Sequence, residues 1–550
     1  PAAAAVDHAV AESLLRCWVR EHGIEVAAPT LVLRLIDGRT LTAPVRSVSA
    51  TGWHRFGPAA LDGGVVDAGA LVTVLADELV SRHQLTGAQR LDVIARTLDS
   101  RDRITEHALV RQGKTLSLPP SFLDGEQELV AGHPFHPAAK SREEFDGDER
   151  VAFSPELHGN FPLRWLAVDR DLVSTGSALA RTAEDLLDDL TCRPGAPDGT
   201  VAVPLHPWQA RMLLARPAVA ALVEQGMITD LGDGTHSWYP TSSLRTVWRP
   251  GSPWMLKLSL GVRITNSRRQ NLRAELQLGQ LAHQLLAAGI ADELTRAHPR
   301  FRVITDPAWI GVDVAEGGFD TAIRQNAFPT PAPVVCMAAL LDERPGCGGP
   351  LLVDILRGIA ASTGRAPVDV AHDWLGRYLD EVVAPLCWLD TRWGIVLEAH
   401  HQNTLVTLDD DGWPTGGWYR DNQGWYFAAS EAERLRELLP AAAQELDAVF
   451  DDDLVARRGA YYLGVNNVFG LVGALGAAGV APEEELLATA RAALLRLPRS
   501  RVLEMLLHAA RIPCKANLLT CADGRDELVG AVEHQSIYVD VPNPLAEVRT

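Results

Sequence analysis

The sequence predicts an α+β protein of several domains, with mixed or antiparallel sheets and a helical C-terminal part. Three observations support this fold class. The chain has 550 residues, which is too long for one hydrophobic core and corresponds to about three to four domains of usual size. Alternating apolar and polar residues at several places before residue 430 predict β-hairpins. After residue 430, segments rich in alanine and leucine have the period of amphipathic helices.

The expected elements follow the chain in order. Residues 8–23 have helical periodicity, and residues 31–45 form two alternating runs around an Asp37-Gly38 turn. The runs "SSLRTVW" (242–248) and "WMLKLSL" (254–260), joined by a turn-rich linker, predict a second hairpin. Further helices are expected at 267–288, 349–362 and 370–387. Proline and glycine concentrate at 329–350, so we expect domains at 1–130, 131–335 and 336–550.

Charge and cysteine content exclude some classes of protein. With 51 Lys+Arg against 70 Asp+Glu the net charge is -19, so nucleic acid is excluded as the main partner. Seven scattered cysteines without a CxxC pair indicate reduced thiols. The first residues lack the basic start of a signal peptide, and the apolar stretch 463–482 contains two asparagines and five glycines. We therefore expect a cytoplasmic protein with no membrane partner, in which 463–482 forms a helical hairpin.

The segment "EAHHQN" (398–403) places unusual polar chemistry between two apolar runs. If it is a strand, Glu398, His400 and Gln402 lie on one face, and Ala399, His401 and Asn403 on the other. In a cleft, Glu398 could hold Mg²⁺ with Asp421 of "YRDNQG", while His400 and Gln402 orient a substrate carboxylate. The alternative is a buried polar network without ligands.

Cations recur within the other polar motifs. Lys140, Arg142, Arg245, Lys257 and Arg269 could together form an anion site, although Arg245 and Lys257 could also be ordinary solvated charges. Arg268 and Arg269, at the start of the helix expected at 267–288, oppose the helix dipole, which can mark an anion site.

The two histidines of "HPFHP", His133 and His136, suggest a second kind of site. They could hold zinc with Glu398 and His400, but each precedes a proline, which favours a hydrogen-bonding role. No Walker A motif and no dinucleotide-binding glycine turn occurs, so a nucleotide site must be of another kind.

The motifs occur in one order along residues 131–424: "GHPFHPAAKSR", "VPLHPWQ", "SSLRT", "KLSLGVRITNSRRQN", "EAHHQN" and "YRDNQG". In this order they resemble the IucA/IucC family, the siderophore synthetases that act without a nonribosomal template. The resemblance implies a cupped hand of thumb, fingers and palm, often dimeric. It implies an ATP-dependent ligase that activates a carboxylate, such as citrate or a citrate derivative, as an acyl-adenylate. An amine or alcohol then displaces AMP.

Site residues follow from the same resemblance. ATP binding is implied for His136, Ser243, Arg245, Thr246, Lys257 and Asn403. Carboxylate binding is implied for Thr265, Arg269, His400 and Gln402. Mg²⁺ is implied at Glu398 and Asp421. Among these residues, His400, Arg269 and Lys257 are the candidate catalytic residues.

Two departures from the family pattern concern substrate choice. Glu144 stands before Phe145 where a glycine is expected. In "IPCKANLLTCADG", Lys515 and Asn517 are kept, but a basic continuation is missing. Two rival functions stay open: a nucleotide-binding regulatory protein without activity, and a metallohydrolase using His133, His136 and Glu398.

Overall fold

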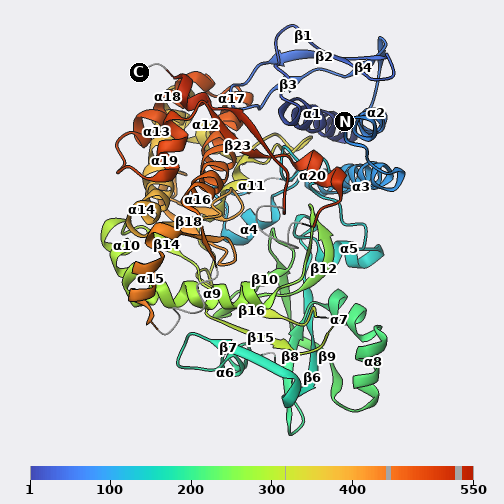
Figure 1. Cartoon of the computed structure of the whole chain (residues 1–550), viewed down its shortest axis with the longest axis vertical. Helices are drawn as coiled ribbons and strands as arrows, with labels where there is room; N and C mark the ends of the chain where they lie inside the picture. Colours follow the sequence, from blue (N-terminus) through green and yellow to red (C-terminus); the bar gives the residue numbers. More distant parts are fainter. Residues whose placement is uncertain are drawn as a thin grey trace.

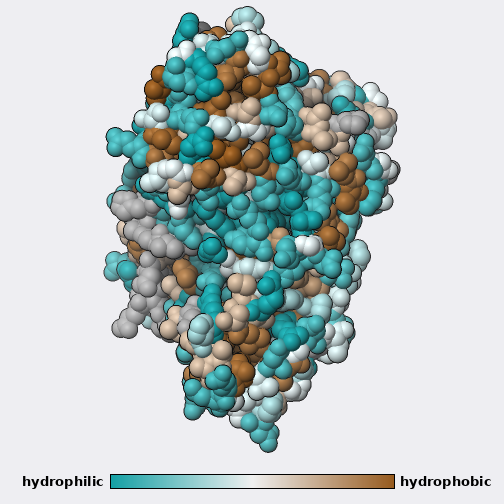
Figure 2. All heavy atoms as spheres, turned by 90° about the vertical axis from the view of Figure 1, so that its right-hand side faces the viewer, coloured by the Kyte–Doolittle hydropathy of each residue, from teal (hydrophilic) through white to brown (hydrophobic). Residues whose placement is uncertain are grey.

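Figure 1 shows the computed structural model, which describes residues 2–114, 116–191, 193–315, 317–440, 448–526 and 535–548. The N-terminal elements and the C-terminal helices lie side by side in the upper half, and a large sheet from the middle of the chain fills the lower half (Figure 1). In a view turned by 90°, hydrophilic residues gather in a band across the middle of the molecule (Figure 2).

The N-terminal part combines three long helices with a small sheet. The hairpin expected around Asp37-Gly38 is confirmed, because Thr30 to Arg34 pair antiparallel with Pro44 to Thr40. The elements are α1 (Ala2–Glu21), β1 (Thr30–Arg34), β2 (Thr40–Ser47), β3 (Arg55–Phe56), β4 (Ala60–Leu61), β5 (Gly64–Val65), α2 (Ala68–His83), α3 (Gly87–Arg111) and α4 (Phe122–Gln127).

The lower half is an eight-stranded sheet in the order β7-β15-β16-β11-β10-β9-β6-β8. Its strands are β6 (Phe161–Asp169), β7 (Val173–Ser177), β8 (Thr200–Leu205), β9 (Ile228–Pro240), β10 (Thr246–Trp248), β11 (Trp254–Lys257), β15 (Ala308–Val312) and β16 (Thr321–Gln325). The helices of this region are α5 (Gly147–Phe153), α6 (Ala183–Asp188), α7 (Pro207–Leu214), α8 (Pro217–Glu224), α9 (Arg273–Leu285) and α10 (Ala291–Ala297). A separate hairpin joins β12 (Leu260–Ile264) to β13 (Ser267–Arg269).

Smaller sheets complete the molecule. They contain β14 (Phe301–Val303), β17 (Val334–Cys336), β18 (Ile395–Leu397), β19 (Thr404–Leu408), β20 (Pro414–Tyr419), β21 (Trp425–Ala428), β22 (Val449–Phe450), β23 (Arg511–Lys515) and β24 (Tyr538–Pro542). The pairs β14-β20 and β21-β22 are parallel and the other described pairs are antiparallel, so the predicted α+β class with mixed sheets is confirmed.

The second half of the chain is mainly helical. Its α-helices are α11 (Met337–Leu341), α12 (Leu351–Thr363), α13 (Pro367–Tyr378), α14 (Ala384–Trp393), α15 (Ala432–Leu438), α16 (Asp452–Gly459), α17 (Phe469–Ala477), α18 (Glu483–Leu494), α19 (Arg501–His508), α20 (Asn517–Asp523) and α21 (Pro544–Glu547). The helix expected at 349–362 is confirmed as α12. The one expected at 370–387 is longer, because a π-helical turn at Leu379–Val383 joins α13 to α14.

Two large hydrophobic cores organise these elements. One runs from Phe145 to Ile323 and fills the space between the eight-stranded sheet and the helices α5 to α8, whereas α9 and α10 contribute to the other core. The other joins N-terminal residues such as Trp18 to C-terminal residues such as Leu506, so both ends of the chain pack in one core. The division into three domains at 130 and 335 stays a prediction.

Two predicted helices differ from the structure. The helix expected at 267–288 begins at Arg273, because Ser267 to Arg269 form β13, and Arg268 and Arg269 therefore do not stand at a helix N-terminus. The hairpin expected at 463–482 is also wrong. A π-helical stretch at Ala460–Val468 joins α16 to α17, and residues 452–477 form one helix.

Close packing explains why the glycines of this helix do not break it. A Cβ placed on Gly464 would lie 2.2 Å from a Leu506 methyl, and one on Gly470 would lie 2.4 Å from the His401 ring. A Cβ on Gly473 would lie 2.2 Å from the Trp53 ring. These glycines let neighbouring side chains approach the helix, which is a different use of glycine from a turn.

Among the described residues, no helix is long and apolar enough to cross a membrane. The six cysteines of the described ranges are unpaired thiols, as expected, and Cys192 lies outside those ranges.

Candidate active site

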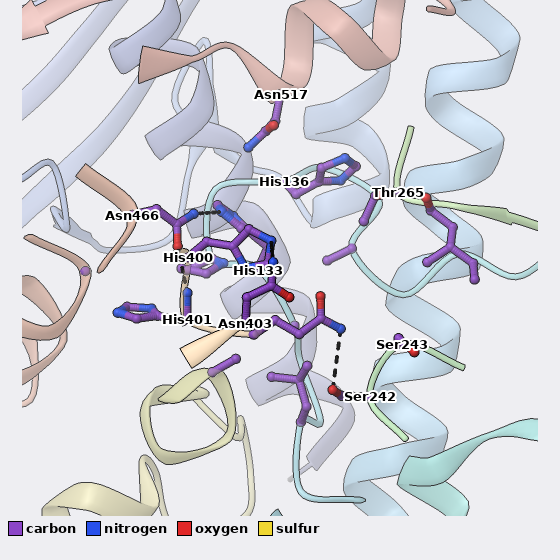
Figure 3. Close-up of a pocket in the computed structure, with 18 of the residues that line it drawn as sticks. His133, His136, Ser242, Ser243, Thr265, His400, His401, Asn403, Asn466 and Asn517 are labelled. Carbon is purple, nitrogen blue, oxygen red and sulfur yellow. Dashed lines mark hydrogen bonds between the residues drawn. The ribbon is translucent and has the colours of Figure 1, made fainter. Parts of the chain in front are cut away.

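A cavity of about 320 Å³ lies where the two cores meet. It is lined by Arg20 of α1, by Trp53, and by residues of the segment 129–142, of the strands β10 to β13, of the segment 398–403 and of the C-terminal helical part. All twelve predicted site residues line it: His136, Ser243, Arg245, Thr246, Lys257, Thr265, Arg269, Glu398, His400, Gln402, Asn403 and Asp421. Figure 3 shows His133, His400, Asn403 and Asn466 on one side, with Ser243 and Thr265 on the other.

The hairpin β10-β11 brings two buried cations to this cavity. Thr246 pairs with Lys257 in the register of the hairpin, so the predicted hairpin is present. The Lys257 ammonium donates to Asp421 Oδ1 at 2.7 Å and to Gln423 Oε1 at 2.6 Å. Burial lowers the pKa of Lys257 to about 8, and Asp421 opposes this shift. Lys257 is therefore charged at neutral pH, but less firmly than a surface lysine.

Arg245 lines the cavity and also stabilises the backbone of the neighbouring strand β13. Its guanidinium donates to the carbonyl of Arg269 and to Asn271 Oδ1, both at 2.9 Å, and to Gln423 Oε1 at 3.1 Å. Burial lowers the pKa of Arg245 to about 10. Because Arg245 holds the end of β13, its removal would disturb the backbone at Arg269.

Asp421 stands in a left-handed conformation, with φ of 97°, after strand β20. Burial alone would raise the pKa of its carboxyl, but Lys257 and Arg324 outweigh burial and lower the pKa below the ordinary value. Arg324 Nη2 lies 3.9 Å from Asp421 Oδ1 and is itself held by Asp306 at 2.6 Å. Asp421 is thus an ionised carboxylate among cations.

The segment 398–403 is a turn and not a strand, so the predicted division into two faces is wrong. β18 ends at Leu397 and β19 begins at Thr404, and these strands belong to different sheets. The chain passes from one sheet to another here, and a polar side chain stabilises the turn. Asn403 Nδ2 donates to the Glu398 carbonyl at 2.9 Å. His401 and Asn403 therefore line the cavity together with Glu398, His400 and Gln402.

His400 lies at the centre of this turn. Burial lowers its pKa to about 3, with Asp421 opposing and Lys515 adding to the shift. Its Nε2 lies 3.3 Å from Asn403 Nδ2 and 3.9 Å from Glu398 Oε1. The imidazole is therefore neutral at physiological pH.

The hairpin β12-β13 carries the groups predicted to bind a carboxylate. Its two-residue turn consists of Thr265, with φ of 53°, and Asn266, since Ile264 pairs with Ser267. Arg269 Nη2 donates to Thr265 Oγ1 at 2.9 Å. This places a guanidinium and a hydroxyl side by side on the cavity wall.

The other predicted cations are neutralised within the protein. The Lys140 ammonium donates to Glu156 Oε1 at 2.5 Å, and Arg142 bonds to both oxygens of the same carboxylate at 2.7 and 2.9 Å. All three side chains are buried. The interpretation of Lys140 and Arg142 as part of an anion site is therefore not supported.

The His-Pro motifs are turns closed by histidine. Nδ1 of His133 accepts from the backbone N–H of Phe135 at 3.1 Å, and Nδ1 of His136 accepts from that of Ala138 at 3.0 Å. His206 repeats the geometry with Trp208 at 3.2 Å. Within the described ranges, no three His, Cys, Asp or Glu side chains form a group that could hold a metal ion. The zinc alternative is therefore not supported.

Several cavity residues were not predicted as site residues. Arg20 and Trp53 come from the N-terminal part, Tyr462 and Asn466 from the π-helical stretch, and Arg324 from β16. Arg324 is the charged residue of the short strand β16, and a charge within a strand is a sequence signal that could have identified it as a site residue. Arg20 lies in an ordinary amphipathic helix, where its sequence context gives no signal.

Comparisons with known proteins identify the family of the chain. Residues 121–342 match the model of the IucA / IucC family, and residues 372–530 match a model described as ferric iron reductase FhuF-like transporter. The chain is 38% identical to the rhizobactin siderophore biosynthesis protein RhbC of Rhizobium meliloti, over 93% of this chain and 91% of the relative. It is 32% identical to a spermidine-citrate ligase of Bacillus anthracis, over 98% and 97%.

Solved structures extend the likeness to the whole fold. The ATP-bound aerobactin synthetase IucA of Klebsiella pneumoniae superposes with a TM-score of 0.86 at 29% identity, covering 98% of this chain and 99% of that one. The petrobactin biosynthesis protein AsbB of Bacillus anthracis shares the fold at 16% identity, with a TM-score of 0.81 and coverage of 99% and 96%. This chain belongs to the IucA/IucC family of siderophore synthetases, which act without a nonribosomal template.

Proposed function

We propose that this protein is an ATP-dependent ligase that adenylates a carboxylate, citrate or a citrate derivative, and condenses it with an amine or alcohol. One observation carries the proposal: a single cavity joins the cations of β10-β11, the Thr265–Arg269 pair of the next hairpin and the polar turn 398–403. The names of relatives support it, since one is a spermidine-citrate ligase and another an N(2)-citryl-N(6)-acetyl-N(6)-hydroxylysine synthase of Escherichia coli.

In the first step a carboxylate oxygen attacks the α-phosphorus of ATP. The bond from the α-phosphorus to the bridging oxygen breaks, and pyrophosphate leaves with the electron pair. Two anions meet in this step, so positive charge at the cavity wall lowers the barrier. We assign the phosphates to Ser243, Arg245, Thr246 and Lys257 with His136 nearby, and the nucleotide also to Asn403.

The substrate carboxylate is assigned to Thr265, Arg269, His400 and Gln402. Arg269 supplies a charge-assisted bond beside the Thr265 hydroxyl. Because burial lowers the pKa of His400 to about 3, its imidazole is too weak a base to accept a proton at neutral pH, and we assign it an orienting role.

The donor chemistry of the cavity fits Mg²⁺. Glu398 and Asp421 are carboxylates that both line the cavity, and Mg²⁺ prefers one or two carboxylates together with phosphate oxygens and water. When bound, the ion supplies positive charge to the phosphates. Glu398 and Asp421 would hold the ion, and Lys257, which donates to Asp421, would add positive charge beside it.

In the second step the neutral amine attacks the acyl carbon. A carbon–nitrogen bond forms, the bond from the acyl carbon to the AMP oxygen breaks, and AMP leaves with the electron pair while the nitrogen loses a proton. Proximity to the held adenylate supplies much of the rate. We further propose a homodimer, to be tested by light scattering, and a cytoplasmic location, where ATP is supplied.

The test is citrate-dependent exchange of labelled pyrophosphate into ATP, followed by steady-state kinetics of Arg269→Ala. Loss of the Arg269 contact should raise the KM for the acid about thirtyfold, which corresponds to roughly 2 kcal/mol, and change the KM for ATP much less. If the KM for ATP rises and that for the acid does not, Arg269 belongs to the phosphate site. Failure of exchange with every carboxylate tried would leave only nucleotide binding and refute the ligase.

A further inference from the structure

A buried carboxylate behind the cavity, that of Glu126 on α4, is connected to three segments that line the cavity. In the part of the chain that the structure describes, Glu126 is 0% exposed and does not itself line the cavity. The three segments are the loop 241–245, the turn 398–403 and the residues that follow β20. The inference below rests on the proposed function, because it concerns how these segments act together in the same reaction.

Both oxygens of the Glu126 carboxylate are bonded within the protein. Oε2 accepts from the backbone N–H of Ser242 at 2.8 Å and from the Ser242 hydroxyl at 2.7 Å. The Arg420 guanidinium donates to Oε1 at 2.7 Å and to Oε2 at 3.2 Å. The side chains of Glu126 and Arg420 are buried, so their charges balance each other in a place that water does not reach.

Arg420 and Ser242 extend this network to the polar turn 398–403. Arg420 Nε donates to the Gln402 carbonyl at 2.9 Å, and the backbone N–H of Arg420 donates to the Asn403 carbonyl at 2.9 Å. Ser242 Oγ accepts from Arg420 Nη2 at 3.2 Å and from Gln402 Nε2 at 3.4 Å, and the second bond is drawn as a dashed line in Figure 3. The end of the turn is therefore tied to the loop 241–245 through Arg420.

The helix α4 gives Glu126 a fixed position. At its start, the Ser121 hydroxyl accepts from the backbone N–H of Asp124 at 3.4 Å and donates to Asp124 Oδ2 at 2.6 Å. A Cβ placed on Gly125 would lie 2.8 Å from a Val335 methyl, so α4 packs closely against β17. Because the helix is capped and tightly packed, the carboxylate of Glu126 can serve as a rigid support for the segments that it binds.

The connected segments carry groups that we assign to different reactants. The loop carries Ser243 and Arg245, assigned to the phosphates, and the turn carries Gln402, assigned to the substrate carboxylate. Asp421, assigned to the metal, directly follows Arg420. Adenylation requires the carboxylate oxygen to meet the α-phosphorus, and a misplacement of about 1 Å can lower a rate on the order of 10²-fold.

We propose that Glu126 is a positioning residue for adenylation, which sets the loop 241–245 against the turn 398–403 and Asp421. It acts through Ser242 and Arg420 and does not touch either substrate. Each segment keeps its own binding groups when Glu126 is replaced. Loss of Glu126 therefore slows the reaction of the bound complex more than it weakens the binding of ATP or of the acid.

The test is Glu126→Gln in the full chain, assayed by pyrophosphate exchange with citrate and ATP varied in turn. Glutamine keeps the size of the side chain but does not balance the charge of Arg420. We expect kcat to fall at least about tenfold, while the KM for citrate and the KM for ATP each change less than about threefold. A smaller fall in kcat, or a loss expressed mainly in one KM, would overturn the inference.

Glu128→Gln is the matched control. Glu128 lies two residues further along, is 3% exposed and pairs with Arg111 at 2.9 Å and with Arg344 at 3.0 Å. Among the described residues that line the cavity, none of these three occurs. Both variants should lower the melting temperature, because each removes one charge of a buried pair, but only Glu126→Gln should lower kcat. The same fall in kcat in the control would refute a positioning role.

Ser242→Ala serves if Glu126→Gln does not fold. It removes one bond to Glu126 and keeps the pair with Arg420, so kcat should fall at least about threefold with both KM values nearly unchanged. An unchanged kcat in this variant would refute the inference. Absence of citrate-dependent pyrophosphate exchange in the wild type instead refutes the proposed function.

Discussion

Arg96, on helix α3, holds the tip of the hairpin that carries the carboxylate-binding groups. The side chain is 1% exposed, its Nη2 donates to the Thr265 carbonyl, and its Nη1 lies 3.1 Å from Cys521 Sγ on α20. Thr265 has a left-handed backbone, with φ of 53°. A threonine in this region is strained by about 1–2 kcal/mol, so contacts from outside the hairpin must hold it.

Arg96→Met removes this support while keeping much of the side-chain volume. The Thr265 carbonyl loses its buried donor, at a cost of about 1–3 kcal/mol, and the turn can recover its strain by leaving the left-handed region. The bond of 2.9 Å from Arg269 Nη2 to Thr265 Oγ1 then loses its geometry. We expect the KM for the carboxylic acid to rise about ten- to thirtyfold, which corresponds to about 1.4–2 kcal/mol.

The assay is pyrophosphate exchange with the acid and ATP varied in turn. Arg111→Met is the matched control, because Arg111 lies on the same helix, is 4% exposed and donates to a backbone carbonyl, that of Gln127, at 2.6 Å, but does not line the cavity. Both variants should lower the melting temperature, but only Arg96→Met should raise the KM for the acid. Equal changes in the KM for the acid and for ATP, or the same change in the control, would refute the reasoning.

Two further predictions concern pH and the metal. Burial lowers the pKa of His206 to about 3. Between about pH 6.5 and pH 3, the unfolded chain therefore binds a proton at this histidine that the folded chain does not bind. The free energy of unfolding consequently falls as the pH falls through this range. His206→Asn, which keeps an acceptor for the Trp208 N–H, should reduce this slope by up to about 1.4 kcal/mol per pH unit in urea denaturation at pH 5–6; an unchanged slope contradicts the assignment. Glu398→Gln and Asp421→Asn should each raise the Mg²⁺ concentration needed for half-maximal activity, and normal Mg²⁺ dependence in both would move the metal elsewhere.

The motifs predicted which residues meet, but not the backbone that brings them together. The hairpin predicted from "SSLRTVW" and "WMLKLSL" is present, because strand periodicity and a proline-glycine turn agree there, but its strands cover only Thr246–Trp248 and Trp254–Lys257, and Ser242 to Arg245 form a turn. "EAHHQN" was interpreted as a strand because apolar runs flank it, but those runs enter different sheets. The change of sheet depends on distant partners, such as Asn467, whose Nδ2 donates to the Ala399 carbonyl at 2.8 Å.

The strand β13 also differs from the prediction, which placed the start of a helix there, and the reason is related. The turn of Thr265 and Asn266 lacks the glycine that usually marks a two-residue hairpin, so the sequence predicts a helix over residues that form β13. Arg96, which supports this turn, is far away in the sequence and belongs to a helix whose pattern is ordinary. Neither residue could be connected to the other without the structure.

Three non-glycine residues at the cavity have left-handed backbones: Leu244 next to Arg245, Thr265 next to Asn266, and Asp421 after Arg420. Local sequence preference does not explain leucine or threonine there, so tertiary contacts must stabilise these conformations. The contacts come from the protein itself: Leu244 N–H donates to the Thr241 carbonyl at 2.8 Å, Arg96 donates to the Thr265 carbonyl, and Lys257 donates to Asp421. Because contacts within the protein support all three positions, little binding energy is needed to order Arg245, Arg269 and Asp421 around the cavity.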